Sequence, residues 1–155
     1  MPDLGLAANN PDPTNANSPD MELALLIKVM QEASAIAMEC WERGVKAEVK
    51  TDFHNIRTEA DERVEEFLRL QFRKHYPSYT LLGEETGGTP SQLMIVWDPI
   101  DGTNAFERGM EDWCISMARI VGGIPTVGVI AMPAKRMPEI YYASLGYGAF
   151  LVEPH

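Results

Sequence analysis

The chain has 155 residues, a length that suits one domain or most of one. It carries 13 Lys and Arg against 23 Asp and Glu, so its formal net charge is −10 at pH 7. This balance argues against nucleic-acid and anionic-membrane partners, which require a basic surface. It fits a protein that gathers cations at carboxylates, although solubility alone explains most acidic proteins.

Only two cysteines occur, Cys40 and Cys114, and there is no C-x-x-C motif. A disulfide framework is therefore not expected, and a reducing cytoplasm is the default location. No apolar run reaches the length of a membrane span. The first residues also lack the basic start and apolar core of a secretory signal. We therefore expect a cytoplasmic protein.

The N-terminal part of the chain predicts a tail followed by two helices. Residues 1–20 are rich in Pro, Asn and Asp without periodicity, which is typical of a disordered tail ahead of a domain spanning 21–155. The first helix opens with Ser18 as its cap and Pro19 at its first position. Apolar residues then recur at helical spacing, and Gly44 ends the helix. The second helix follows Thr58, a candidate cap, and stops before Pro77.

From Tyr79 onward the pattern changes to short apolar runs separated by turn residues. Six strands are predicted: Tyr79–Leu82, Leu93–Trp97, Cys114–Val121, Thr126–Met132, Glu139–Ala143 and Ala149–Val152. Gly122-Gly123 predicts a hairpin turn between two of them. Two helices followed by a strand meander predict an α+β (layered α/β) fold, with both helices packed on a largely antiparallel sheet.

The most informative segment reads Trp97-Asp98-Pro99-Ile100-Asp101-Gly102-Thr103. An apolar strand ends at Asp98, and Pro99 initiates a tight turn that can bring Asp101 to the same side. Gly102 permits close approach by a ligand. Two carboxylates and a backbone carbonyl are the oxygen ligands that Mg²⁺ takes. Asp-Pro and Asp-Gly are also ordinary turn dipeptides, so this segment alone leaves a plain loop open.

A second acidic segment, Gly83-Glu84-Glu85, also ends a short apolar strand. If the two strands are neighbours that end at the same edge, Glu85 lies next to Asp98. Three carboxylates, including that of Asp101, would then converge, an arrangement that is unstable without cations. Glu84 is expected at most to contact one of these ligands, without binding the metal itself. The alternative is an exposed acidic loop.

Together these two segments resemble the signature pair of the inositol monophosphatase family. Three further matches follow the family order: Arg57-Thr58-Glu59-Ala60-Asp61 with Glu65 resembles its T-x-A-D-x-x-x-E helix start, Lys50 lies where the family often has a lysine, and Gly146-Tyr147-Gly148-Ala149-Phe150 resembles its G-x-G-A-F hairpin. The resemblance covers residues 21–152. It implies a Mg²⁺-dependent phosphomonoester hydrolase that acts on a small phosphorylated polyol, sugar or amino alcohol, with two or three Mg²⁺ ions per site.

The resemblance also implies a role for each matching residue. The implied metal ligands are Glu85, Asp98, the Ile100 carbonyl and Asp101. The implied catalytic residues are Glu85, Thr103 and Asp61, with Thr103 hydrogen-bonded to Asp61 and orienting the attacking water. The implied substrate-binding residues are Gly102, Thr103 and Asp101. Backbone N–H groups of Gly102 and Thr103, at the start of a short helix, are implied to hold the phosphate oxygens.

Two departures from the family leave alternatives open. Family members continue well past the G-x-G-A-F hairpin, so we expect a sugar-phosphatase-like N-terminal domain whose C-terminal α/β half is absent. A catalytically inactive truncated fragment, or a metal-binding or interaction module, is therefore the alternative function. The order Asn104-Ala105-Phe106 resembles the histidinol-phosphate phosphatase branch, which leaves histidinol phosphate or a sugar bisphosphate as alternative substrates. The resemblance also allows a homodimer, which nothing in the sequence establishes.

Overall fold

The computed structural model describes residues 19–44, 48–49 and 56–152. Three features named above lie outside these ranges: most of the predicted tail, the Ser18 cap and Lys50.

Both predicted helices are present. Helix α1 (Pro19–Arg43) starts at Pro19, where a missing N–H breaks no helical hydrogen bond. Helix α2 (Glu59–His75) is capped by Thr58, whose side chain accepts a hydrogen bond from the backbone N–H of Asp61. The apolar residues of each helix recur every three or four positions, so one face of each is buried: Leu26, Met30, Ala33 and Ala37 in α1, and Val64, Leu68 and Phe72 in α2.

Six strands form one sheet in the order β3-β4-β5-β6-β7-β8. Their bounds are β3 (Thr80–Gly83), β4 (Leu93–Asp101), β5 (Cys114–Val121), β6 (Ile124–Met132), β7 (Glu139–Ser144) and β8 (Gly148–Val152). Strand β3 runs parallel to β4, and every other neighbouring pair is antiparallel. The predicted layered fold with a largely antiparallel sheet is therefore confirmed.

Two short strands were not predicted: β1 (Glu48–Val49) and β2 (Ile56–Arg57), which pair with each other. The short helix that the family resemblance implies at this point is present as α3 (Thr103–Glu107), directly after β4. Strand β4 also continues past its predicted end at Trp97 to Asp101. This continuation contains an irregularity in the pairing with β5, between Asp98 and Asp101, and Pro99 lies within it. An irregular register tolerates Pro because no ladder hydrogen bond is lost there.

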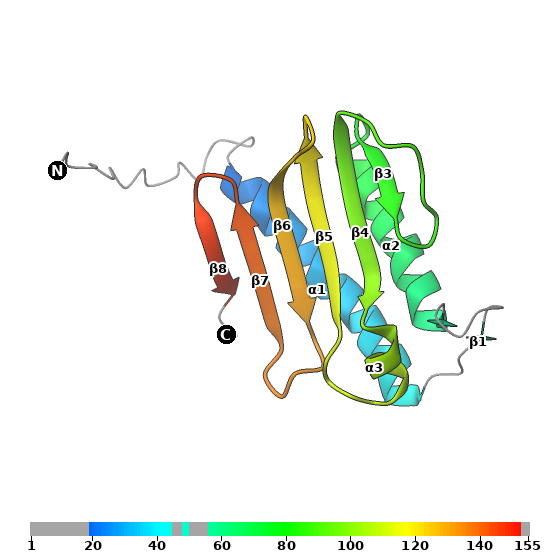
Figure 1. Cartoon of the computed structure of the whole chain (residues 1–155). Helices are drawn as coiled ribbons and strands as arrows, with labels where there is room; N and C mark the ends of the chain where they lie inside the picture. The colour runs from blue at the N-terminus through cyan, green and yellow to red at the C-terminus, as the bar shows by residue number, and fades with distance from the viewer. Residues whose placement is uncertain (1–18, 45–47, 50–55, 153–155) are drawn as a thin grey trace.

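Both long helices pack on the same face of the sheet, and the opposite face is uncovered by the described residues (Figure 1). Alternating strand residues point toward the helices and form the core, including Ile95, Trp97, Ile115, Met117, Val127 and Val129. Phe72 of α2 meets Trp97 of β4 with their ring centroids 5.4 Å apart. Among the described residues, no helix combines the length and apolarity needed to cross a membrane.

Candidate active site

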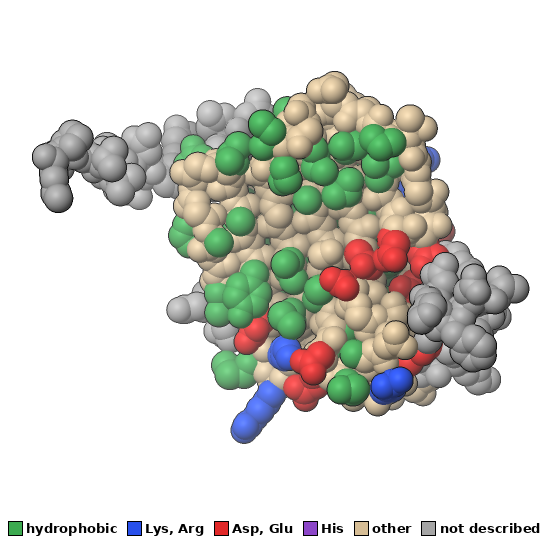
Figure 2. All heavy atoms as spheres, in the orientation of Figure 1, with side chains coloured by type: hydrophobic (Ala, Val, Ile, Leu, Met, Phe, Trp, Pro, Cys, Tyr) green, Lys and Arg blue, Asp and Glu red, His purple; other side chains and the backbone are tan. Residues whose placement is uncertain are grey.

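The carboxyl ends of the parallel strands β3 and β4 lie at the same edge of the sheet. Gly83 pairs with Trp97, and the N–H of Glu84 donates to the Trp97 carbonyl at 3.1 Å. The next residues along the two strands are Glu84 and Asp98, which therefore lie side by side, and their carboxyl groups share a hydrogen bond. Figure 2 shows acidic side chains gathered on the β3–β4 side of the open face at this level.

This arrangement gives Asp98 an unusual environment. Burial, the hydrogen bond and charge of Glu84, and the charge of Asp101 together raise the pKa of Asp98 from 3.8 to about 7. The Ile100 N–H opposes this by donating to Asp98 Oδ1 at 3.0 Å. Asp98 therefore gives up its proton less readily than a free aspartate, and a bound cation is an alternative way to relieve the repulsion around it.

The turn after β4 requires glycine at position 102. Gly102 has φ +93°, and a Cβ there would lie 2.9 Å from the Asp112 carbonyl oxygen. Helix α3 starts directly after it, with the N–H groups of Ala105 and Phe106 donating to the Gly102 carbonyl. The predicted substrate-binding residues Asp101, Gly102 and Thr103 are therefore brought together at the start of α3.

Asp61 lies at the first turn of α2 and is only 3% exposed. Its Oδ2 accepts hydrogen bonds from the Thr58 N–H at 2.7 Å and from the Thr58 hydroxyl at 2.6 Å. Burial raises the pKa of Asp61, the Thr58 hydrogen bonds oppose this, and the nearby charge of Glu85 raises it further. The structure therefore brings Asp61 close to Glu85, two of the three predicted catalytic residues.

The predicted hydrogen bond between Thr103 and Asp61 is wrong for this structure. The Thr103 hydroxyl donates instead to the Ile100 carbonyl at 3.0 Å. Asp61, for its part, is engaged in a capping box, in which Thr58 and Asp61 hydrogen-bond each other at the start of α2.

The predicted convergence of three carboxylates is not formed as the side chains stand. Within the described ranges, no three His, Cys, Asp or Glu residues lie close enough together to hold a metal ion. The acidic residues interact in pairs instead: Glu84 with Asp98, Asp98 with Asp101, and Asp61 with Glu85. Convergence of several carboxylates without a cation is electrostatically unfavourable, and Glu84 lies beside Asp98 because the two are hydrogen-bonded.

Sequence reasoning placed Glu85 next to Asp98, and the structure places Glu84 there instead. The missing information was the register of the strands. Once Gly83 is aligned with Trp97, Glu84 becomes the partner of Asp98, while Glu85 is one residue further on.

Cys114, opposite Asp101 on β5, is not an activated thiol, since burial and the charges of Asp101 and Asp98 raise its pKa to about 11.

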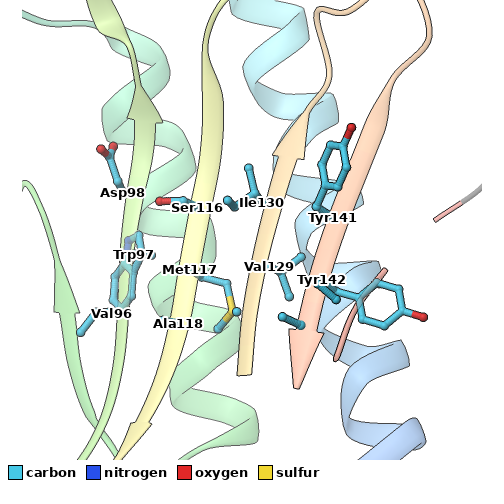
Figure 3. A pocket seen from close by; sticks show the side chains of 13 residues that line it. Val96, Trp97, Asp98, Ser116, Met117, Ala118, Val129, Ile130, Tyr141 and Tyr142 are labelled. Atoms are coloured by element: carbon cyan, nitrogen blue, oxygen red, sulfur yellow. The ribbon is translucent and has the colours of Figure 1, made fainter. Parts of the chain in front are cut away.

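The open face of the sheet carries a hollow of about 550 Å³ beside this edge. Small residues form much of its lining: Ser116, Ala118, Gly128, Ala143 and Ala149. Asp98 on β4 and Tyr141 on β7 lie on opposite sides of it (Figure 3). The acidic edge of the sheet therefore adjoins a largely apolar surface.

Replacing Thr58 with Ala is expected to destabilise the protein by about 0.5–2 kcal/mol, the usual effect of losing a helix cap. The replacement also leaves Asp61 without its hydroxyl donor. Thr58→Ser is the matched control, because it keeps the hydroxyl. Urea unfolding measures both variants, and an equal loss of stability in the two would show that the methyl group matters rather than the cap.

The raised pKa of Asp98 predicts a pH dependence. The unfolded chain has the ordinary pKa of 3.8, so between 3.8 and about 7 the folded, metal-free protein binds more protons than the unfolded chain. Its stability should therefore fall as pH rises through this window.

A divalent cation at Asp98 must displace the proton, so Mg²⁺ affinity should rise with pH and level off above about 7. Calorimetric Mg²⁺ titrations at about pH 6, in buffers of different ionisation enthalpy, measure the released proton, and its absence would contradict the assignment.

Comparison with known proteins identifies relatives along most of the chain. The profile of the Inositol monophosphatase family matches residues 19–155. A fructose-1,6-bisphosphatase/inositol-1-monophosphatase of Thermotoga maritima is 33% identical over 124 residues, which are 80% of this chain and 48% of that protein. A histidinol-phosphatase of Chlorobaculum parvum is 34% identical over 137 residues, 86% of this chain and 51% of the relative.

Solved structures share the fold. The IMPase of Thermotoga maritima superposes with a TM-score of 0.78 at 31% identity, covering 87% of this chain and 52% of that one. An IMPase/NADP phosphatase complexed with Mg²⁺ and phosphate has a TM-score of 0.75 at 21% identity, which shows the fold alone. This chain spans about half the length of these relatives. With the family profile matching from α1 onward and the same layered fold, the chain belongs to the inositol monophosphatase family.

Proposed function

We propose that residues 21–155 form the metal-binding part of a Mg²⁺-dependent phosphomonoester hydrolase for a small phosphorylated metabolite. The observation that carries this proposal is the carboxyl group of Asp98, which is hydrogen-bonded to Glu84, lies close to Asp101 and has a pKa raised to about 7. Buried carboxylates with perturbed pKa values at the edge of a sheet are typical of functional sites.

The donor atoms present at this edge fit Mg²⁺, which prefers carboxylate and carbonyl oxygens. The proposed ligands are Asp98, Asp101, the Ile100 carbonyl, Glu84 and Glu85. The Ile100 carbonyl accepts the Thr103 hydroxyl, and its second lone pair remains for a cation. We propose two or three ions per site. One Mg²⁺ ion keeps several of its waters and therefore cannot use all five oxygen donors.

When bound, Mg²⁺ polarises phosphoryl oxygens and lowers the pKa of a coordinated water. The chain's own groups do the remaining work. The first N–H groups of α3, at Gly102 and Thr103, are proposed to hold the phosphate oxygens, since a helix start leaves such donors without helical partners. Thr103, Asp61 and Glu85 are proposed to orient the attacking water. For Thr103 this requires its hydroxyl to leave the Ile100 carbonyl.

The relatives support the substrate class but not one substrate. Their names specify inositol monophosphate, fructose bisphosphate and histidinol phosphate as substrates of those proteins. A phosphate ester of a small polyol, sugar or amino alcohol is common to all three, so we propose this class for the present chain.

A cytoplasmic location and a homodimer stay predictions. The location is predicted from the two free cysteines, Cys40 and Cys114.

The test combines metal binding with catalysis. Calorimetry of the chain with Mg²⁺ should give saturable binding, and p-nitrophenyl phosphate, inositol phosphate, histidinol phosphate and fructose bisphosphate should be hydrolysed only with Mg²⁺. Binding without hydrolysis would support the alternative of a metal-binding module. Neither binding nor hydrolysis would overturn the proposal.

A further inference from the structure

One buried charge has no part in the chemistry proposed above. Glu65 lies on α2, one turn after Asp61, and is only 3% exposed. It shares the inner face of α2 with the apolar residues Val64, Leu68 and Phe72. Burying a carboxylate among apolar side chains is strongly unfavourable unless the charge is paired and hydrogen-bonded, so its partners need an explanation.

Three side chains donate hydrogen bonds to this carboxylate. The Trp97 indole N–H reaches Oε2 at 2.6 Å, the Thr86 hydroxyl reaches Oε1 at 2.5 Å, and the Arg69 guanidinium reaches Oε1 at 2.9 Å. Arg69 also lies over the Trp97 ring, with its guanidinium carbon 5.3 Å from the ring centroid. Both carboxylate oxygens are thus engaged, and the positive charge of Arg69 offsets the buried negative charge.

The partners of Glu65 flank the proposed metal ligands in the sequence. Trp97 immediately precedes Asp98 at the end of β4, and Thr86 immediately follows Glu85 after β3. The carboxylate also lies directly against β3, because a Cβ at Gly83 would fall 2.0 Å from Glu65 Oε1. One side chain of α2 therefore connects the two chain segments that carry Glu84, Glu85 and Asp98.

We infer that Glu65 is a positioning residue of the metal site. It fixes the distance between the Glu84-Glu85 segment and Asp98 by holding Thr86 and Trp97 with its two oxygens. The β3–β4 hydrogen bonds hold the two strands together only as far as Glu84. Glu65 holds the segment beyond this point through Thr86, so it limits the movement of Glu85 relative to Asp98. The inference rests on the proposed function, because it assigns Glu65 to the same Mg²⁺ site.

The test is the replacement Glu65→Gln, with Glu66→Gln as the matched control. Gln keeps the size of the side chain but has an NH2 group, which only donates, in place of one carboxylate oxygen. With its oxygen toward Trp97, it no longer accepts from Arg69, and its hydrogen bond with Thr86 must reverse direction. Glu66 is exposed on the same helix. Loss of a residue that orients metal ligands typically weakens metal affinity roughly ten- to hundredfold. We expect this increase in the Mg²⁺ Kd for E65Q and an unchanged Kd for E66Q, each measured by calorimetry well below its unfolding midpoint.

A second readout does not depend on metal. The indole N–H resonance of Trp97 in metal-free protein should shift in E65Q and stay in place in E66Q. If E65Q does not fold, Thr86→Val removes one donor at nearly the same size, and Trp97→Phe removes the other donor while keeping an aromatic ring. Each should raise the Mg²⁺ Kd.

The outcomes separate two failures. A wild-type chain that binds no Mg²⁺ would overturn the proposed function and, with it, the role of Glu65 at a metal site. A wild-type chain that binds Mg²⁺, with equal affinity in folded E65Q, T86V and W97F, would overturn the positioning role alone. Glu65 would then only stabilise the fold.

Discussion

Replacing Asp98 with Asn is expected to abolish Mg²⁺ binding while making the metal-free protein more stable at neutral pH. The two effects have one cause. Above a pH of about 7, the Asp98 carboxylate carries a charge that burial, Glu84 and Asp101 all disfavour. Asn removes this charge and can donate its amide N–H to Glu84, which should stabilise the metal-free fold by about 1–3 kcal/mol. Losing a direct ligand should weaken Mg²⁺ affinity by more than the roughly hundredfold upper range for residues that only orient ligands.

The matched control is Asp112→Asn. Its side chain is 72% exposed and pairs with Lys135 at 2.7 Å, so its loss should change stability little. Thermal unfolding with EDTA and with Mg²⁺ compares the three proteins. Mg²⁺ should raise the melting temperature of wild type and D112N but not of D98N, because only native protein binds the ion. A D98N protein that Mg²⁺ stabilises as well as wild type would remove Asp98 from the site.

The elements of the fold could be predicted because their signals are local. Helix α2 follows from its Thr58 cap and from apolar residues at helical spacing, and both ends of β5 follow from one uninterrupted β-run. The end of β4 could not be predicted in this way. Pro99 indicates the end of a strand, yet β4 continues to Asp101 because an irregularity in the pairing with β5 accommodates the proline.

The site was less predictable because its contacts depend on register and on competition between partners. The prediction that the two acidic segments end at one edge needs only the parallel pairing of β3 with β4. Which glutamate faces Asp98 depends on a shift of one residue, and Glu84 rather than Glu85 does so here. The Thr103 hydroxyl donates to the Ile100 carbonyl here and is proposed to turn to the attacking water. A sequence motif does not indicate which of these partners the hydroxyl binds.

The second large effect is expected for Gly102→Ala, which should destabilise the protein and remove phosphate binding. Position 102 combines a left-handed backbone with a close contact, since its φ is +93° and a Cβ would lie 2.9 Å from the Asp112 carbonyl oxygen. The backbone conformation alone disfavours Ala by about 1–2 kcal/mol, and the contact adds strain of about 1–3 kcal/mol. Relief of this strain requires the start of α3 to move, which displaces the N–H groups of Gly102 and Thr103.

Gly109→Ala separates the two contributions. Gly109 also has a left-handed backbone, with φ +66°, but a Cβ added there would meet no atom within 4 Å. It should therefore lose only the conformational contribution of about 1–2 kcal/mol. Urea unfolding gives the stabilities, and calorimetry with inorganic phosphate in the presence of Mg²⁺ gives the ligand affinities. Phosphate affinity should fall sharply in G102A and stay near wild type in G109A. Equal stability losses and retained phosphate binding in both variants would mean that the turn at 102 has room for a side chain and does not hold the phosphate.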